Sequence, residues 1–262
     1  MLKGKKVSSK NSVSRDTLVA FLDSLLETSK IKDHSCNGLQ VEGTGQIKKI
    51  ALAVDASMEA YRKAVELDCQ MLIVHHGIIW GGIKSITGTV YSQIKYLLDN
   101  NINLYASHLP LDLHPQLGNN AGLAKLIGLT SLKPFGLYNG LEIGFEGKLV
   151  KHLSLNNLVH LLCEKLGGEC TVLPFGEEKV KRIAVVSGGA AEELDQAIKK
   201  GVDCFITGEP SHPNYHAALE AGINVIYAGH YHTEKPGVQA LGNAIRNRFG
   251  VPTLFTDIPT TI

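Results

Sequence analysis

The sequence has almost no excess of charge of either sign. Its 262 residues include 26 lysines and arginines against 25 aspartates and glutamates, so the formal net charge is +1 at pH 7. A surface that attracts nucleic acid or an acidic membrane needs a local or general excess of basic residues. Basic residues are not interleaved with aromatic ones either. These absences argue against a nucleic-acid surface and favour a small molecule as the partner.

Patterns typical of disulfides and of membrane spans are missing as well. The five cysteines are odd in number and form no C-x-x-C pair, which argues for a reducing compartment. No apolar run reaches the ~18 residues of a membrane span. The basic, polar start MLKGKKVSSKNSVSRD lacks the apolar core of a secretory signal. An amphipathic targeting peptide is the alternative there, but we interpret the stretch as a frayed terminus and expect a cytoplasmic protein.

Strand and helix patterns alternate twice in the same order. Hydrophobic residues make up 44% of the chain, enough for one large or two modest cores. An amphipathic helix from Asp16 to about Glu27 comes first. The first β-α-β-α-β run then comprises KKIALAVD, SMEAYRKAVELDC, QMLIVHHG, YSQIKYLLDNN and INLYASHLPLD. The second comprises KRIAVVSGG, AEELDQAIKKG, VDCFITGEPSH, HPNYHAALEAG and INVIYAGHYHTE. The repeat indicates two related units.

This alternation predicts an α/β fold, with two related α/β units whose mainly parallel or mixed sheets are covered by helices. We place the first unit at residues 1–130 and the second at 131–262, with the C-terminal segment returning to a metal cleft shared by both. Between the repeats, GLEIGFEGKLV and ECTVLPF are predicted strands, and Ser154 begins a helix between them that ends at glycine. Functional sites in such sheets lie beyond the carboxyl ends of the strands.

Histidines and carboxylates follow the predicted strands at those ends. Two adjacent histidines end one strand, and the spacing His-x-x-x-carboxylate follows two others at equivalent places of the repeat. Each motif alone would be an ordinary structural feature. Four imidazoles and two carboxylates together exceed the three or four protein ligands of one catalytic metal. The sequence therefore predicts a two-metal site with the ligands His75, His76, His108, Asp112, His230 and Glu234. We expect the histidine pair at a surface strand end and Glu234 on a loop, bridging two ions.

Three further motifs have competing interpretations. Glu209 and His212 follow a strand at the repeat position of the histidine pair, which suits acid–base residues lining the cleft, although capping of the next helix fits nearly as well. The turn at 187–189, Ser-Gly-Gly, could receive a phosphate but is better explained as a tight turn between strand and helix. Trp80 could stack on a base, although packing at a rim is the commoner role.

Taken together, the motifs resemble GTP cyclohydrolase 1 type 2 homologues, also called the Nif-three-like family. The resemblance runs from about residue 14 to the C-terminus. The chain is similar to the short form of the family, which has no inserted domain. The departures are Cys36, where the family often has Asp, and Asn120-Ala121, where it often has Asn-Asp. They touch no proposed ligand and bear on substrate preference. The matching segments are SCNGLQVEG, VHHGIIWGG, SHLPLDLHPQLGNNAGLAKLIGL, TGEPSHPNYHAALEAG and GHYHTEKPGVQAL.

The resemblance implies that the six predicted ligands surround a dinuclear centre with two divalent ions per subunit, of zinc, iron or manganese. It also implies a toroidal homohexamer and a GTP cyclohydrolase-like reaction, in which water adds to a purine-type ring. We therefore expect a metal-dependent hydrolase acting on a small nucleotide-like or heterocyclic substrate. The alternative is a non-enzymatic metal-binding or adaptor protein. Structural zinc sites are usually filled by cysteine and histidine, and no cysteine joins this cluster, which argues mildly against the alternative.

Overall fold

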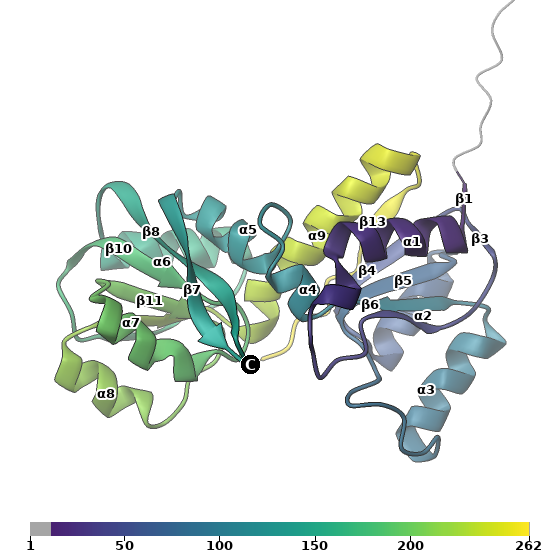
Figure 1. Ribbon diagram of the computed structural model, residues 1–262, viewed down its shortest axis with the longest axis horizontal. Coiled ribbons are helices and arrows are strands. Elements are labelled where there is room, and N and C mark those ends of the chain that lie inside the picture. Colours follow the sequence, from purple (N-terminus) through teal and green to yellow (C-terminus); the bar gives the residue numbers. More distant parts are fainter. Residues whose placement is uncertain (1–11, 262) are drawn as a thin grey trace, which may run out of the picture.

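Two helix-flanked sheets organise the part of the chain that the computed structural model describes, residues 12–261 (Figure 1). The interpretation of the basic N-terminal stretch as a frayed terminus concerns mainly residues 1–11, which lie outside the described residues. The first sheet has the spatial order β13 (Thr253–Phe255), β4 (Ile50–Asp55), β5 (Met71–His76), β6 (Asn103–Ala106) and β2 (Gly38–Val41). A separate antiparallel pair joins β1 (Val13–Ser14) to β3 (Gln46–Ile47).

The second sheet repeats the arrangement at its centre. Its order is β7 (Thr130–Tyr138), β8 (Leu141–Ser154), β10 (Lys179–Val185), β11 (Cys204–Thr207), β12 (Asn224–Tyr227) and β9 (Thr171–Pro174). Strands β10, β11 and β12 are parallel, as are β4, β5 and β6 in the first sheet. Strands β2, β8 and β9 add antiparallel pairings. The predicted α/β fold with mixed sheets is confirmed.

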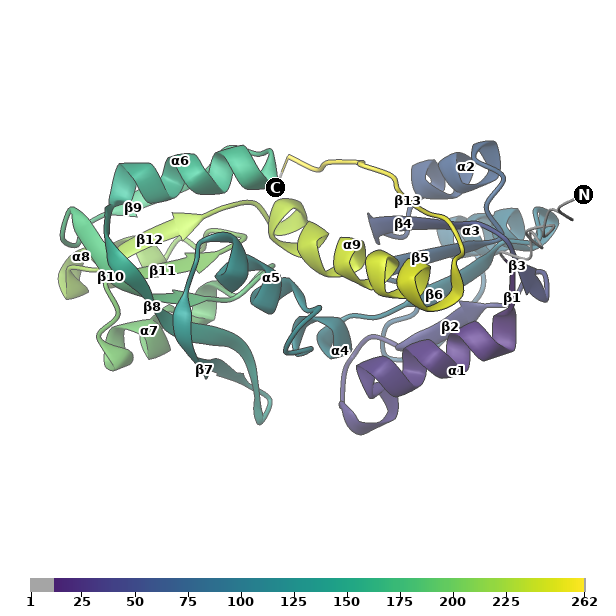
Figure 2. The same ribbon diagram turned by 90° about the horizontal axis from the view of Figure 1, so that it is seen from above.

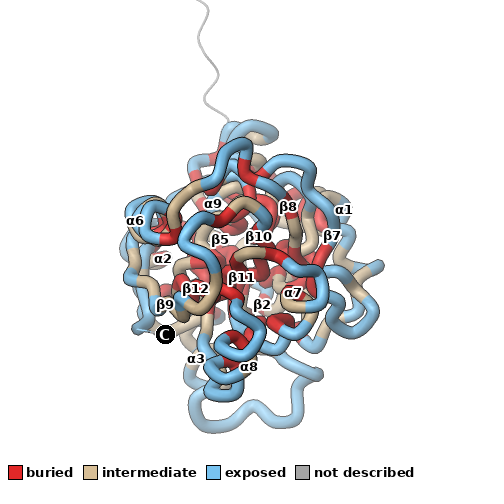
Figure 3. The backbone as a smooth tube through the Cα atoms, turned by 90° about the vertical axis from the view of Figure 1, so that its left-hand side faces the viewer, coloured by how far each residue is buried: buried red, intermediate tan, exposed pale blue. Residues whose placement is uncertain are grey.

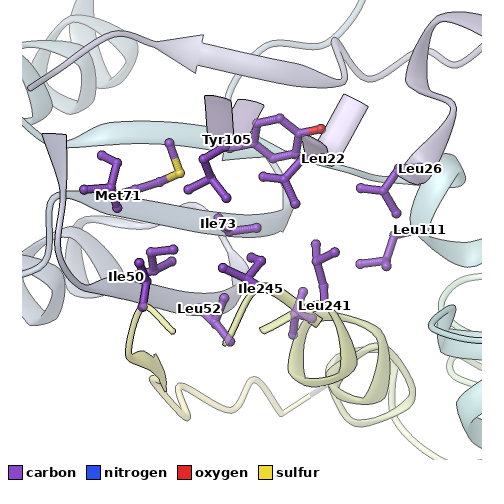
Figure 4. Packing of buried hydrophobic residues seen from close by; sticks show 14 of the residues in the cluster. Leu22, Leu26, Ile50, Leu52, Met71, Ile73, Tyr105, Leu111, Leu241 and Ile245 are labelled. Carbon is purple, nitrogen blue, oxygen red and sulfur yellow. The ribbon is translucent and has the colours of Figure 1, made fainter. Parts of the chain in front are cut away.

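Helices cover both faces of the first sheet because alternate strand residues point to opposite sides. Ile50 and Leu52 face α1 (Arg15–Leu26) and α9 (His230–Phe249), whereas Ala51 and Ala53 face α2 (Met58–Glu66) and α3 (Gly88–Asp99). Figure 4 shows side chains of α9 packed against those of β4 and β5. With both faces covered, the strands read as continuous apolar runs rather than alternating ones.

The second sheet is covered in the same way. Ile183 and Val185 pack with α5 (Asn119–Leu126) and α6 (Leu155–Leu166), whereas Ala184 and Val186 pack with α7 (Leu194–Lys200) and α8 (Asn214–Ala221). The central strands are buried (Figure 3). As predicted, Ser154 caps α6 by accepting a hydrogen bond from the backbone N–H of Asn157, and Gly167 ends this helix in a left-handed conformation.

Helix α9 joins the two halves of the molecule. It begins beside α5 and α6 and continues across the first sheet, where it meets β13 (Figure 2). The parallel pairing of β13 with β4 brings residues 253–255 back to the first sheet. The C-terminal segment thus returns across the molecule, and the unit boundary at residue 130 remains a prediction. Within residues 12–261, every helix is too short or too polar to cross a bilayer.

Several elements were not expected from the sequence. The segments after β6 and β12 are predicted as loops, but they form α4 (Leu109–Asp112) and the 20-residue helix α9. Strand β7 is also new; it forms a hairpin with β8 through Asn139 and Gly140, which have φ of 48° and 83°. Asn-Gly is a strong signal for such a two-residue turn, because both positions need positive φ.

Candidate metal centre

The carboxyl ends of the parallel strands bring the predicted ligands of both repeats together between the two sheets. His75 and His76 are the last residues of β5, and His108 lies between β6 and α4. Asp112 ends α4, while His230 and Glu234 occupy the first turns of α9. His230 and Glu234 are four residues apart on one helix, so their side chains share a face. All six residues belong to overlapping groups whose ligand atoms lie within 4.8 Å of one another.

Glu234 occupies the middle of this cluster. Its Oε1 lies 3.4 Å from His75 Nε2 and 3.1 Å from His230 Nε2. Its Oε2 lies 3.3 Å from His76 Nε2. Asp112 Oδ2 lies 3.4 Å from the same Nε2 atom of His75. The two carboxylates of the repeated motif, more than a hundred residues apart in sequence, therefore meet at one nitrogen atom.

Each of the four imidazoles is held from behind through its Nδ1 atom. An imidazole that donates a hydrogen bond from Nδ1 has its free lone pair on Nε2 when neutral, and this arrangement is typical of histidines that bind metals. The Nε2 atoms are thereby directed away from these acceptors and toward the cluster. The four contacts are His75 to the Ser107 carbonyl at 2.8 Å, His76 to Asp55 at 2.8 Å, His108 to Asp33 at 3.0 Å and His230 to Glu209 at 2.5 Å.

Two buried atoms of the cluster have no hydrogen-bond partner within the described residues. They are Nε2 of His75 and Oε2 of Glu234. The separations of 3.3–3.4 Å between these side chains and their neighbours are long for hydrogen bonds. Buried polar atoms are costly when unpaired. A cation among imidazole nitrogens and carboxylate oxygens would satisfy both atoms, so the residues fit the predicted metal ions.

The charges of the cluster shift the pKa values of its members in opposite directions. Burial lowers the pKa of His75, but the Asp112 and Glu234 carboxylates outweigh it and raise this pKa well above its usual value. The pKa of His230 rises to about 9, because Glu234 and Glu209 also outweigh burial there. Conversely, the histidines lower the pKa of Glu234 far below its usual value in spite of burial. In the metal-free protein, protonated histidines therefore supply the positive charge that balances the carboxylates.

Two expectations about local placement are wrong. His75 is fully buried, not at a surface strand end, because β5 continues through His76 and is covered on both faces. Glu234 lies on a helix rather than a loop, and its side chain is only 4% exposed. Gly188 makes room for it: a Cβ atom at this position would overlap with Oε1 of Glu234. Glu234 is therefore packed closely against the turn at Gly188.

A cavity of about 410 Å³ opens beside the cluster and is lined by residues of both halves. Asp112, His230 and Glu234 form part of its wall, and Glu209 lies next to them. His212 is exposed and lies outside the set of residues lining the cavity, although the neighbouring Ser211 belongs to it. The structure therefore brings Glu209, but not His212, to the cluster.

Trp80 and the Ser-Gly-Gly turn take simple roles. The Trp80 ring lies 5.1 Å from the ring of His108 and 6.1 Å from that of His76, at the rim of the cluster. In the turn, the backbone N–H of Ser187 donates to Asn120 and that of Gly188 donates to Thr233. Because these two N–H groups already have protein partners, the interpretation as a tight turn fits better than phosphate binding.

Of the carboxylates behind the histidines, the sequence analysis named Glu209 but missed Asp55 and Asp33. Asp55 ends β4 directly opposite His76 in the parallel register, so pairing the two predicted strands could have found it. Asp33 lies in a loop and accepts hydrogen bonds from Asn37 as well as from His108. Asp112 is held by Asn119 at 2.9 Å and by the Ser187 hydroxyl at 3.0 Å. No strand pattern pointed to Asp33 or Asn119.

Fold and cluster together define a class: mixed α/β proteins with a group of potential metal ligands between two sheets. Comparison with known families identifies the particular one. The chain belongs to the family described as Duf34/NIF3 (NGG1p interacting factor 3), whose model matches residues 13–261.

Relatives and solved structures agree with this assignment. The chain is similar to GTP cyclohydrolase 1 type 2 homologs of Archaeoglobus fulgidus (50% identity, 94% of this chain and 98% of the relative) and Pyrococcus horikoshii (47%, 95% and 99%). It is also similar to the structure of protein ybgI, of unknown function (TM-score 0.89, 36% identity, 95% of this chain and 100% of the other). The structure of TTHA1606 from Thermus thermophilus gives a TM-score of 0.87 at 40% identity, with 95% and 100% covered.

Proposed function

We propose that this protein is a dinuclear metal-dependent hydrolase acting on a small nucleotide-like or heterocyclic substrate. The observation that carries the proposal is the convergence of four imidazole Nε2 atoms and two carboxylates beside a cavity of about 410 Å³. The names of the relatives support a GTP cyclohydrolase-like reaction, since several are called GTP cyclohydrolase 1 type 2 homologs.

The proposed ligands divide around Glu234. His75 and Asp112 form one group of potential ligands with Glu234, and His76 and His230 form another with it, while His108 forms a third group with the histidine pair. Glu234 is the residue we propose as the bridge, because it belongs to both of the groups that contain a carboxylate. Two bound divalent ions would activate water and polarise the bond under attack. Imidazole with carboxylate suits zinc, iron or manganese.

Glu209 is the residue we propose as the proton carrier. It lines the cavity, its side chain is 37% exposed, and it accepts the Nδ1 proton of His230. A carboxylate in this place can orient His230 and exchange a proton with a bound substrate. The proposed acid–base role of His212 needs a movement of its loop, because this side chain points to solvent rather than lining the cavity.

Assembly as a toroidal homohexamer remains part of the proposal. Large apolar side chains are exposed on the β7–β8 hairpin, with Leu137 at 57% and Val150 at 75% exposed, and these suit a contact between subunits. The chain has a mass of 28.3 kDa. Sedimentation equilibrium should give about six times that mass, and a monomer would contradict the proposal.

Metal analysis followed by a substrate panel tests the function. The purified protein should contain two divalent ions per chain and should hydrolyse a member of a panel of nucleotides and heterocycles, with activity lost to a chelator and restored by metal. Two tightly bound ions without turnover of any panel member would favour the metal-binding or adaptor alternative. A protein without metal affinity would contradict both.

A further inference from the structure

The two oxygens of the Asp112 carboxylate have different surroundings. Oδ1 accepts one hydrogen bond from Nδ2 of Asn119 at 2.9 Å and another from the Ser187 hydroxyl at 3.0 Å. Oδ2 instead faces Nε2 of His75 at 3.4 Å. A carboxylate oxygen has about two lone-pair sites, so the two donors fill those of Oδ1. Oδ2 is therefore the oxygen that Asp112 can offer to a metal ion.

The backbone of α9 fixes the orientation of the Asn119 amide. Asn119 is fully buried, and its Oδ1 accepts the backbone N–H of Gly237 at 2.8 Å. The oxygen and nitrogen of an amide are assigned from their partners, and a backbone N–H can only donate. The NH₂ group must then be turned toward Asp112. Asn119 thus makes one bond to a proposed ligand and one to α9.

Helices α5 and α9 approach closely at this point (Figure 2). A Cβ atom at Gly122 would lie 2.7 Å from Cβ of Pro236, and one at Gly237 would overlap with Oδ1 of Asn119. Glycine at both positions leaves the space that this approach requires. Gly237 follows Glu234 by less than one helical turn. The Asn119 amide therefore contacts the part of α9 that carries the second carboxylate of the cluster.

We propose that Asn119 is a positioning residue of the metal centre. It holds Asp112 so that Oδ2 alone faces the ions, and it ties this carboxylate to the turn of α9 that carries Glu234. The Ser187 hydroxyl is the second donor that holds the same oxygen atom. Both carboxylates are then in place before an ion arrives, which reduces the cost of ordering them on binding. This inference rests on the proposed function, because it concerns two ligands of the proposed centre.

A double-mutant cycle separates this role from a purely structural one. The variants are Asn119→Leu, which is similar in shape but has no amide, Ser187→Ala, and the two changes combined. Each single change should weaken Zn²⁺ binding by the full chain about tenfold, as measured against a competing chelator. Both donors act on one oxygen, so the combined loss should exceed the product of the single losses. If Asn119 only joined α5 to α9, the losses would multiply.

A second variant displaces the amide without changing Asn119. The methyl group of Gly237→Ala would overlap with Oδ1 of Asn119, so Zn²⁺ affinity should fall as it does in Asn119→Leu. Gly242→Ala is the matched control on the same helix, because its methyl group would overlap with the side chain of Leu52 instead. The control should lower Tm but keep the Zn²⁺ affinity of the unaltered protein.

Every outcome bears on the proposal. Unchanged affinity in Asn119→Leu, or single losses that simply multiply in the combined variant, would overturn it. Should Asn119→Leu not fold, Gly237→Ala decides in the same way. A crystal structure of the unaltered protein with Zn²⁺ needs no variant, and binding of an ion through both oxygens of Asp112 would also overturn the proposal. Failure of the unaltered protein to bind Zn²⁺ or another divalent ion would refute the proposed function instead.

Discussion

Substitution of single residues is the strongest test of the proposed metal centre, and we begin with Glu234. Glu234→Gln keeps the shape of the side chain but removes the charge that balances two dications in a buried place. Metal content should fall from two ions per chain to one or none, as measured by elemental analysis. Glu178→Gln, an exposed carboxylate, should leave the content unchanged. Full occupancy in Glu234→Gln would show that the carboxylate does not bind metal.

Variants of Asp55 test whether the carboxylates that accept hydrogen bonds from the proposed histidine ligands contribute to metal binding. Its carboxylate accepts the Nδ1 proton of His76 at 2.8 Å, and loss of such a partner typically weakens metal binding by about 10–100-fold. We expect that loss in Asp55→Ala and a partial recovery in Asp55→Asn, whose amide oxygen can still accept the proton. The measurement is metal affinity by competition with a chromophoric chelator. Asp99→Ala on exposed α3 is the control, and equal affinities would argue against positioning by Asp55.

The titrating residues predict how pH affects the metal-free protein. The pKa of His230 rises from 6.5 to about 9 on folding, so its stabilising contribution is complete below about pH 6.5 and is lost as pH rises through about 9. The pKa of Glu234 is lowered from 4.5, so its contribution is present above about pH 4.5 and is lost in acid. Thermal unfolding in chelator should show a Tm that declines from about pH 6.5 to about pH 9.5. The metal-loaded protein should lack this decline. If Tm depended on pH in the same way with and without metal, the predicted effect of the carboxylates on the histidine pKa values would be contradicted.

At the residue scale, sequence reasoning found the residues of the cluster because strand ends are visible in the hydrophobic pattern. His75, His108 and His230 each follow or end an apolar run that could form only a buried strand. Burial of His75 was missed, since it depends on α9 covering the sheet, which the local pattern does not reveal.

At the scale of elements, helices and strands were predicted correctly where the signals that define them lie within a few residues. Helix α6 was placed by a serine cap and a terminal glycine, both of which act within a few residues. Helix α9 was not recognised, because it contains Pro236, Gly237 and Gly242, and proline and glycine have low helix propensity. Tertiary contacts override that propensity: Val238, Leu241 and Ile245 are buried against the first sheet. Long-range packing of this kind cannot be read from a window of sequence.

One pair of elements carries a redox prediction. Cys163 on α6 and Cys170 before β9 have Sγ atoms 3.3 Å apart, although all five cysteines are free. Hydrogen peroxide should oxidise one thiol to a sulfenic acid; the other thiol then attacks the sulfenic sulfur, forming a disulfide and releasing the hydroxyl group as water. Intact mass, after blocking of remaining thiols, should reveal the loss of two hydrogens, and Cys163→Ser should prevent it. Burial and then Cys163 raise the pKa of Cys170 to about 12, so the reaction should be faster in alkali.

At the scale of the whole molecule, α9 and the cluster tie the two sheets together. The proposed ligands come from β5, from the segment that includes α4 and from α9, and α9 also contacts α5 and α6. We expect a single calorimetric transition in the metal-loaded protein, shifted to lower temperature by chelator, because ligands that bind only the folded state stabilise it. Two separate transitions, with only one sensitive to chelator, would show that the halves unfold independently.

The pairing of β13 with β4 has a consequence for synthesis on the ribosome. The partner of Ala51 is Leu254, so about 200 residues must be translated before the edge of β4 is covered. At roughly 5–20 residues per second this takes about 10 to 40 s. For that time the nascent chain presents an open, apolar strand edge, which is the kind of surface that joins other chains. Early folding of the first sheet therefore depends on protection from outside, and chaperone-poor expression should favour aggregation of chains that end before residue 253.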